Sequence, residues 1–270
     1  MRVQLKGHNT AKLFSDLLMK IGNGNLNNYP NDEMDIPANL GNLFSNLDEL
    51  IIKIHPEEQK LQEKSSEWFC ERCILAARNE TADFINNKIM GQFNAEEKTY
   101  MSIDRMVEES ESINYPIEFL NSLQPTGLPP NKLCLKIGAP IMCLRNLNPP
   151  ILCNGTRLQV IGMMDNVIEA TILTGRGKGE RVFIPRIPLI PSDYPFQFKR
   201  LQFPVKICFA MTINKSQGQS IQYTGVDLRT PCFSHGQFYV ACSRVSSPDN
   251  LYLLAPTGRT SNIVYNEILK

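Results

Sequence analysis

Residues 203 to 245 constrain the fold of this chain more than any other stretch, because they predict a buried strand that runs directly into a helix N-terminus. Their sequence is FPVKICFAMTINKSQGQSIQYTGVDLRTPCFSHGQFYVACSRV. The apolar run from Val205 to Ala210 fits a short buried strand, and Thr212 stands where a helix N-cap is expected. A helix N-terminus presents free backbone N–H groups and a partial positive charge, which suits a phosphate of a nucleotide or of a nucleic-acid strand. Lys215 adds a full positive charge there.

The second half of this stretch predicts another strand and a second capped helix. Val226 to Leu228 fits a short strand, and Ser234-His235-Gly236-Gln237 has the capping-box spacing that opens a helix from Phe238 to Val245. A further strand, Leu251 to Ala255, follows. Arg244 would then be held rigidly between two buried strands. By pattern alone, a surface arginine near a helix C-terminus is the open alternative.

Two segments of this stretch, MTINKSQGQS and FSHGQFYVACSRV, resemble motifs V and VI of superfamily 1B DNA helicases of the Pif type, most closely the helicase of Helitron rolling-circle transposons. The resemblance continues upstream through PIEFLNSLQPTGLPPNKLCLKIGAPIMCLRNLNPPILCNGTRL and GERVFIPRIPL, and covers residues 66 to 255. It implies an α/β fold, in which a RecA-like second motor lobe (2A) carries an inserted small SH3-like β-barrel (2B). It also implies an ATP-dependent 5′-to-3′ DNA helicase that acts on single-stranded DNA.

The resemblance to motif V implies a contact with the DNA strand. The matching positions are Thr212, Asn214, Lys215 and Ser216. The family usually has His at the position of Asn214.

Other matching positions imply contacts with the nucleotide. Gln217 and Gly218 match the point that links the DNA contact to the nucleotide, and Gln237 and Arg244 match motif VI. Arg244 takes the role of an arginine finger, because a guanidinium near the γ-phosphate stabilises transition-state charge. Arg2 matches an arginine that contacts the terminal phosphate, in which case the chain starts inside that motif.

A phosphate cradle is missing from the sequence. There is no G-x-x-x-x-G-K-[ST] and no acidic pair after a strand to hold Mg²⁺, while the glycine-rich run Gly175 to Gly179 lacks the Lys-Ser/Thr ending. We therefore expect ATP and Mg²⁺ to belong to the complete helicase, in which a first RecA-like lobe normally precedes this one in the same polypeptide. The isolated chain is expected to lack ATPase activity. A truncated gene model, a decayed transposon copy and a piece with a separately encoded first lobe all remain open.

Upstream of this stretch, residues 1 to 125 fit the first part of the 2A lobe. Helical spacing predicts helices over Met1 to Ile21, Leu40 to Ile54 and Ala82 to Met90, with Gly22 to Pro37 as a loop. Strands are expected at Ile74 to Ala77 and at Tyr100 to Ile103. This strand-helix-strand order favours a parallel sheet. The acidic run Asp104 to Tyr115 is expected to be a solvated loop.

The proline-rich segment 124 to 130 marks a change of domain. Five short β-type runs between Leu133 and Leu189 then suggest a small barrel, and we expect residues 126–195 to form the linker and 2B and residues 196–270 to complete 2A. Arg145 and Arg157 lie near turns of this barrel and are candidates for phosphate contacts. Asn154-Gly155 is expected to form a turn.

Charge is distributed unevenly along the chain. Residues 1 to 125 hold 12 Lys and Arg against 20 Asp and Glu, whereas residues 126 to 270 hold 16 against 7. No acidic residue lies between Asp193 and Asp227, where Lys199, Arg200 and Lys206 occur. A basic C-terminal half is expected of a nucleic-acid face, with ordinary charge segregation as the alternative.

The eight cysteines are expected to be reduced and buried, because they lie in apolar runs of a chain without a basic-then-apolar leader or a long apolar span. We therefore expect a nuclear protein, with mitochondrial and cytoplasmic locations as alternatives, and no membrane partner. Cys70 and Cys73 form the only C-x-x-C, which is too few ligands for a structural zinc site, so no metal site is expected. Two other classes stay open: a non-catalytic single-strand-binding remnant of such a helicase, and a metal or redox protein built on these cysteines.

Overall fold

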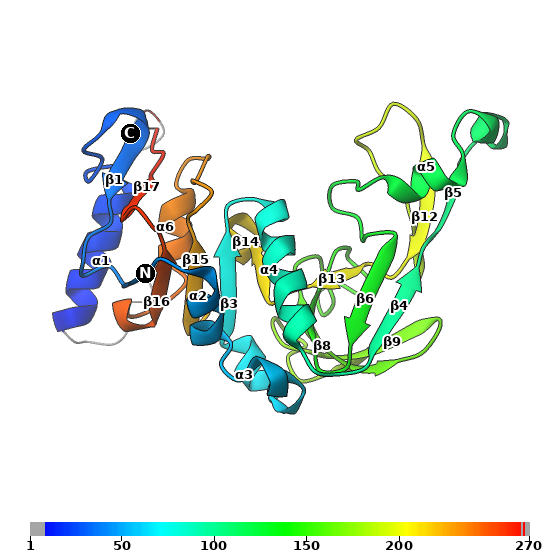
Figure 1. Cartoon of the computed structure of the whole chain (residues 1–270), viewed down its shortest axis with the longest axis horizontal. Helices are drawn as coiled ribbons and strands as arrows, with labels where there is room; N and C mark the ends of the chain where they lie inside the picture. The colour runs from blue at the N-terminus through cyan, green and yellow to red at the C-terminus, as the bar shows by residue number, and fades with distance from the viewer. Residues whose placement is uncertain (1–8, 266, 268–270) are drawn as a thin grey trace. The chain divides into compact units, whose positions relative to one another are not determined.

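The computed structural model describes residues 9–265 and 267, and the chain divides into two compact units (Figure 1). Unit 1 consists of the described residues up to Gln59, of Cys70–Gln92 and of the described residues from Phe209 onward. Unit 2 consists of Lys60–Phe69 and Phe93–Cys208. The boundaries expected after residues 125 and 195 both fall inside unit 2. Strand pairing rather than composition sets the division, since strands on both sides of the proline-rich segment pair with each other.

A five-stranded parallel sheet forms the centre of unit 1. Its strands, in spatial order, are β14 (Ala210–Thr212), β3 (Arg72–Ala76), β15 (Tyr223–Asp227), β16 (Leu251–Leu254) and β2 (Asn42–Phe44). Every neighbouring pair is parallel. The central strands are almost entirely buried, as expected for a parallel sheet that helices cover on both faces.

Helices α2 (Leu47–Ile54) and α4 (Asn79–Gln92) lie side by side on one face of this sheet. The Lys88 ammonium of α4 lies 2.7 Å from an Asp48 carboxylate oxygen of α2. Inside the face, the Asn86 side chain donates to the Ala210 carbonyl and accepts from the Ala210 N–H, which fixes α4 against β14. Helix α6 (Gln237–Cys242) packs against α1 (Asn9–Gly22).

Gly225 of β15 provides the space into which α2 packs. A Cβ at this position would lie 3.1 Å from Ile54 and 3.2 Å from Leu50. Gly225→Ala is therefore expected to destabilise unit 1 by about 1–3 kcal/mol through overpacking. Hydrogen exchange of the β15 amides measures this loss. The matched control is Gly91→Ala in α4, where a Cβ meets no atom within 4 Å and a helical alanine should stabilise by about 0.5–1 kcal/mol; equal protection in both variants would contradict the expectation.

Three sequence expectations for helices and strands are wrong in detail. The helix expected over Leu40 to Ile54 is a strand, β2, followed by α2, because β2 pairs with β16 and Asn46 caps the helix by accepting from the Asp48 N–H. The apolar run Val205 to Ala210 is divided between β13 (Val205–Ile207) and β14, which belong to different sheets. The expected strand Tyr100 to Ile103 does not join the parallel sheet, since β4 (Glu97–Met101) pairs antiparallel with β6 (Lys132–Lys136).

Antiparallel sheets make up unit 2. The largest has the order β10 (Arg181–Pro185), β9 (Val167–Ile172), β8 (Arg157–Met163), β7 (Pro140–Cys143) and β13. A second sheet orders β11 (Ile187–Leu189), β12 (Phe198–Gln202) and β5 (Ile103–Met106). An apolar core packs against the larger sheet and includes Leu158, Val160 and Ile184 of that sheet and Tyr100 and Leu133 of the β4–β6 pair. The expected mixed α/β fold class is confirmed.

The remaining elements are short. They are α3 (Ser66–Cys70), α5 (Ile117–Ser122), the antiparallel pair β1 (Glu33–Asp35) and β17 (Arg259–Ser261), and the 3-10 turns η2 (Pro30–Asp32), η3 (Glu58–Glu63), η4 (Glu109–Ile113), η5 (Ile213–Ser216) and η6 (Pro248–Asn250). Within the described residues, no helix has the length and apolar character needed to cross a membrane.

A buried ion pair joins β5 to β12 in unit 2. Arg200 and Asp104 are both fully buried, and the Arg200 guanidinium donates to both Asp104 carboxylate oxygens at 2.6–3.1 Å. It also donates to the carbonyls of Leu120, Leu123 and Pro129. Neither expectation for this pair holds, because Asp104 is not in a solvated loop and Arg200 does not contribute to a basic surface.

Candidate functional site

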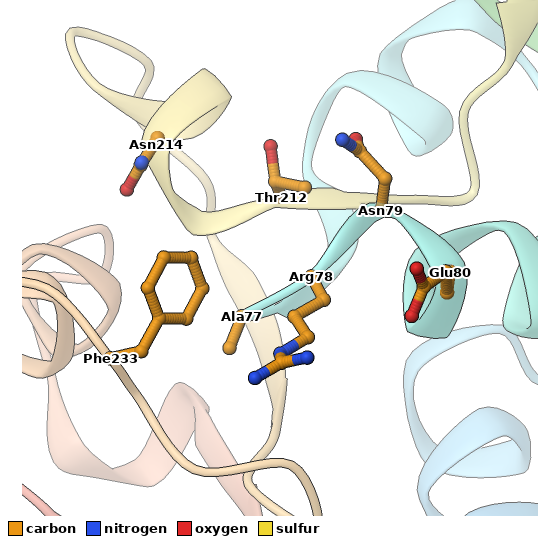
Figure 2. A pocket seen from close by; sticks show the side chains of 7 residues that line it. All are labelled: Ala77, Arg78, Asn79, Glu80, Thr212, Asn214 and Phe233. Carbon is orange, nitrogen blue, oxygen red and sulfur yellow. The ribbon is translucent and has the colours of Figure 1, made fainter. Parts of the chain in front are cut away.

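A cavity of about 370 Å³ opens at the carboxyl edge of the parallel sheet in unit 1 (Figure 2). Ligands of open α/β sheets bind at this edge, outside the carboxyl ends of the strands. β3 ends just before Ala77 and β14 ends at Thr212, so both strands lead into the cavity. Its lining comprises Ala77, Arg78, Asn79, Glu80, Thr212, Asn214 and Phe233.

The motif V residues form a tight turn at this cavity rather than the expected helix. η5 is a 3-10 turn of four residues, and Thr212 occupies its N-cap with an extended backbone but makes no side-chain capping bond. Figure 2 shows the Thr212 and Asn79 side chains pointing to the same side. Asn214 is exposed. The turn thus presents two polar side chains, Thr212 and Asn214, to the cavity.

The other motif V residues are placed differently from one another. Lys215 is half-buried, whereas Gln217 and Gly218 are exposed at the end of the turn. Ser216 is fully buried, and its hydroxyl donates to the Ile213 carbonyl at 2.6 Å. The Ser216 side chain therefore stabilises the turn from inside, which argues against the expected contact of its hydroxyl with DNA.

Arg244 joins the motif V turn to the motif VI helix. Its guanidinium donates to the carbonyls of Ser216 and Gln219 at 3.1 and 3.3 Å. It also donates to the Val240 carbonyl and to the Ser243 hydroxyl, both at 2.8 Å. The side chain is half-buried. A displacement of Arg244 toward a phosphate would therefore break bonds to the turn that carries Thr212 and Asn214.

Gln237, the other motif VI residue, is buried behind the cavity. Its carbonyl oxygen accepts from the Phe233 N–H at 3.0 Å, and its amide makes long contacts with the Ala77 carbonyl (3.4 Å) and the Asn214 side chain (3.5 Å). These three partners all line the cavity. The expected capping box does not form, because the helix N-cap is Gly236 in the left-handed region (φ 66°) without a side-chain bond.

Arg78 and Phe233 belong to the cavity although sequence reasoning did not select them. Phe233 is 52% exposed, and the Arg78 guanidinium lies 5.6 Å from the centre of its ring. An exposed aromatic ring beside an arginine provides a stacking surface for a nucleobase and a positive charge for a phosphate. The sequence signal that could have identified Arg78 is its position, since Arg78 and Asn79 follow a buried strand that ends at the same edge of the sheet as Thr212.

The remaining predicted residues belong to unit 2 or lie outside the described residues. Arg145, in unit 2, donates to the carbonyls of Gly127 and Leu144. Arg157 is fully buried in unit 2 and donates to the Phe69 carbonyl, which argues against the expected phosphate contact. Arg2 lies outside the described residues.

The cysteines near the cavity are unsuited to nucleophilic or metal chemistry. Burial raises the pKa of Cys232 to about 12, and burial also holds the pKa of Cys242 well above its usual value. Both thiols therefore stay protonated near neutral pH. Cys70 and Cys73 lie on separate elements, α3 and β3. Among the described residues, no group of three or more His, Cys, Asp or Glu is arranged to hold a metal ion.

Comparison with protein families assigns part of unit 2. Residues 118–163 match the family model described as DNA helicase Pif1, 2B domain. The fold of the chain is similar to that of solved helicase structures. The crystal structure of Pif1 helicase from Candida albicans covers 96% of this chain with a TM-score of 0.60 at 20% identity, and this chain covers 56% of that one. Pif1 from Bacteroides in complex with ADP-AlF3 and ssDNA gives 0.59 at 21% identity, covering 95% of this chain and 52% of that one.

Curated relatives resemble part of the chain. The ATP-dependent DNA helicase Pif1 of Bdellovibrio bacteriovorus is 33% identical over 138 residues, which are 51% of this chain and 30% of the relative. The ATP-dependent DNA helicase RRM3 of Saccharomyces cerevisiae is 40% identical over 82 residues, which are 29% of this chain and 11% of the relative. The chain thus spans less than a third of these relatives. It is a mixed α/β protein, and its residues 118–163 are similar to the 2B domain of DNA helicase Pif1.

Proposed function

We propose that this chain is the second motor lobe, with its 2B insertion, of an ATP-dependent 5′-to-3′ DNA helicase of the Pif1 family, of the Helitron type. A first lobe supplies the phosphate cradle and the Mg²⁺ ligands. Single-stranded DNA lies over the cavity at the carboxyl edge of the parallel sheet, and the complete helicase acts in the nucleus. The matches to curated helicases and to the 2B family model support this proposal.

The observation that carries the proposal is the double attachment of Arg244. Its guanidinium donates to the Ser216 carbonyl of the turn that bears Thr212 and Asn214, to the Gln219 carbonyl, and to the Val240 carbonyl of α6. If ATP hydrolysis is coupled to movement of the DNA strand, one structural element must shift its position in response to both the nucleotide and the DNA. Arg244 meets this requirement, because a move toward the γ-phosphate releases the Ser216 and Gln219 carbonyls and loosens the strand-binding turn.

Lys215→Ala is expected to weaken binding of single-stranded oligothymidine. The slope of log K against log salt concentration should become shallower by about 0.7, because one phosphate contact is lost. Fluorescence anisotropy at several salt concentrations measures both quantities. Lys20→Ala is the matched control, since Lys20 is an exposed lysine of α1 in the same unit. An unchanged slope for Lys215→Ala would remove Lys215 from the DNA face.

Phe233→Ala is expected to weaken strand binding by about 1–3 kcal/mol, because the exposed ring stacks on a base. The slope against salt should stay unchanged, since no charge is removed. Phe84→Ala is the matched control, as Phe84 is 56% exposed on α4 of the same unit. Equal effects of the two substitutions would show that exposed apolar area, and not stacking at the cavity, determines the affinity.

The second candidate function is a non-catalytic single-strand-binding remnant of such a helicase. It is favoured if no phosphate cradle is encoded together with this chain, whose 270 residues contain no G-x-x-x-x-G-K-[ST] under either candidate. Both candidates bind single-stranded DNA, and they differ in whether Arg244 still supports hydrolysis when a first lobe is joined to the chain.

A further inference from the structure

Unit 2 presents a group of exposed apolar side chains on η4, α5 and the turn between them. Ile113 is 88% exposed, Ile117 57% and Phe119 42%. Single exposed apolar side chains are common, but several on one short segment mark an interaction surface. We call residues 107–119, with the Phe196 ring, the acidic–aromatic surface.

A stack of aromatic rings supports this surface. The Tyr115 ring is stacked on Phe196 with 4.2 Å between centroids, and the Phe119 ring lies 6.0 Å from both. Below the stack, Met106, Leu120 and Phe198 are buried in a core of their own. The exposed side chains are therefore mounted on packed structure and not on a loose segment, which lowers the entropy lost on binding a partner.

The end of α5 is anchored as well. Arg200, held by Asp104, donates to the carbonyls of Leu120 and Leu123, which belong to the last turn of α5 and its C-cap. Helix α5 contacts β5, and β5 pairs with β12 (Figure 1). One helix and one pair of antiparallel strands therefore support the acidic–aromatic surface.

The charged side chains of the acidic–aromatic surface are all negative. Glu108, Glu109, Glu111 and Glu118 lie on it, and no Lys, Arg or His occurs between Arg105 and Lys132. Two exposed basic side chains, Arg105 and Lys199, stand opposite each other on β5 and β12 at the limit of the surface, and the Arg200 guanidinium is buried beneath α5 in its pair with Asp104. Carboxylates repel a phosphate backbone, so the surface does not suit nucleic acid. It complements a positively charged partner.

We propose that the acidic–aromatic surface docks a positively charged protein segment that carries aliphatic or aromatic side chains. The aromatic stack accepts the apolar anchors, and the surrounding carboxylates attract the lysines or arginines beside them, the arrangement of a protein interface with an apolar centre and a charged rim. A second copy of this chain is disfavoured, because a two-fold contact would place identical carboxylates opposite each other. The inference does not depend on the helicase proposal.

Titration of the chain with three synthetic peptides tests the proposal. The first has leucine and lysine on opposite faces of a helix, the second has glutamate in place of lysine, and the third has serine in place of leucine. The leucine–lysine peptide should bind, the glutamate peptide should not, and the serine peptide should bind about tenfold more weakly or worse. Isothermal titration calorimetry measures all three.

Substitutions locate the binding. Ile117→Ser should weaken binding of the leucine–lysine peptide about tenfold. Phe183→Ser should leave the affinity for this peptide unchanged, because Phe183 lies on β10 of the same unit, where it is 61% exposed. The double variant Glu109→Lys with Glu111→Lys alters charge alone and should weaken binding of the peptide similarly. Fluorescence of the single tryptophan, Trp68 of unit 2, checks that each variant is folded.

Several results would overturn the proposal. They are equal binding of the glutamate peptide, no effect of Ile117→Ser and of the double lysine variant, or a dimer of the chain that Ile117→Ser disperses. The last result would mean that a second copy occupies the surface.

Discussion

Arg244→Ala is expected to reduce DNA-stimulated ATP hydrolysis by about a thousandfold or more when this chain is joined to a first motor lobe. The magnitude is that of an arginine finger, whose guanidinium stabilises charge on the transferred phosphoryl group. The missing lobe can be supplied by the part of the Bdellovibrio bacteriovorus relative that this chain does not match, since that relative is 33% identical to this chain over 138 residues, which are 30% of the relative. Steady-state turnover with saturating single-stranded DNA measures the effect.

Two further substitutions sharpen this test. Arg259→Ala is the control, because Arg259 is a half-exposed arginine of the same unit that binds Asp35 and Tyr29 and should not affect turnover. Arg244→Lys keeps the charge but not the planar fork that holds the Ser216 and Gln219 carbonyls, and should also lose most activity. Strand binding should weaken a few-fold in either Arg244 variant, because the strand-binding turn loses the bonds from the guanidinium to the Ser216 and Gln219 carbonyls. Normal turnover of Arg244→Ala would contradict the proposed role.

Arg200→Met is expected to destabilise unit 2 by about 3–5 kcal/mol, since it leaves the Asp104 carboxylate buried without its partner. The carbonyls of Leu120, Leu123 and Pro129 lose their donor at the same time. Urea unfolding followed by Trp68 fluorescence measures the loss, because this single tryptophan lies in unit 2.

The double variant Arg200→Met with Asp104→Leu separates two explanations of that loss. If the unpaired charge causes it, replacing both partners with apolar side chains should restore most of the stability. The exposed pair Arg259–Asp35 provides a comparison, and breaking it should cost about 1 kcal/mol or less. A double variant as unstable as Arg200→Met would assign the loss to the carbonyls that Arg200 also holds.

Sequence patterns predicted where strands and helices of unit 1 occur better than they predicted which strands pair with each other. The buried strand at Ile74 and the helix after it are present, because apolar periodicity reports burial directly. Val205 to Ala210 was predicted as one strand, and the structure divides it between two sheets. Periodicity carries no information on which strand a residue pairs with, so the assignment of each half of this run to its sheet could not be predicted from the sequence.

The candidate site shows the same limit. Motif resemblance selected Thr212 and Asn214, which line the cavity at one sheet edge, and Arg244, whose guanidinium donates to the Ser216 carbonyl of the turn at that edge. It did not select Phe233 or Arg78, because a contact between residues far apart in sequence leaves no local pattern. Arg157 was selected for its charge and its position near a turn, and neither property reveals that the side chain is buried.

Binding of fluorescent single-stranded oligothymidine to the 270-residue chain, measured by anisotropy from low to high salt, tests most directly the claim that this chain is the strand-binding lobe of a helicase. The account predicts binding whose log K falls linearly with log salt, with a slope that reports several phosphate contacts, and weaker binding by Phe233→Ala. No binding at low salt, or binding that neither salt nor Phe233→Ala changes, would contradict it.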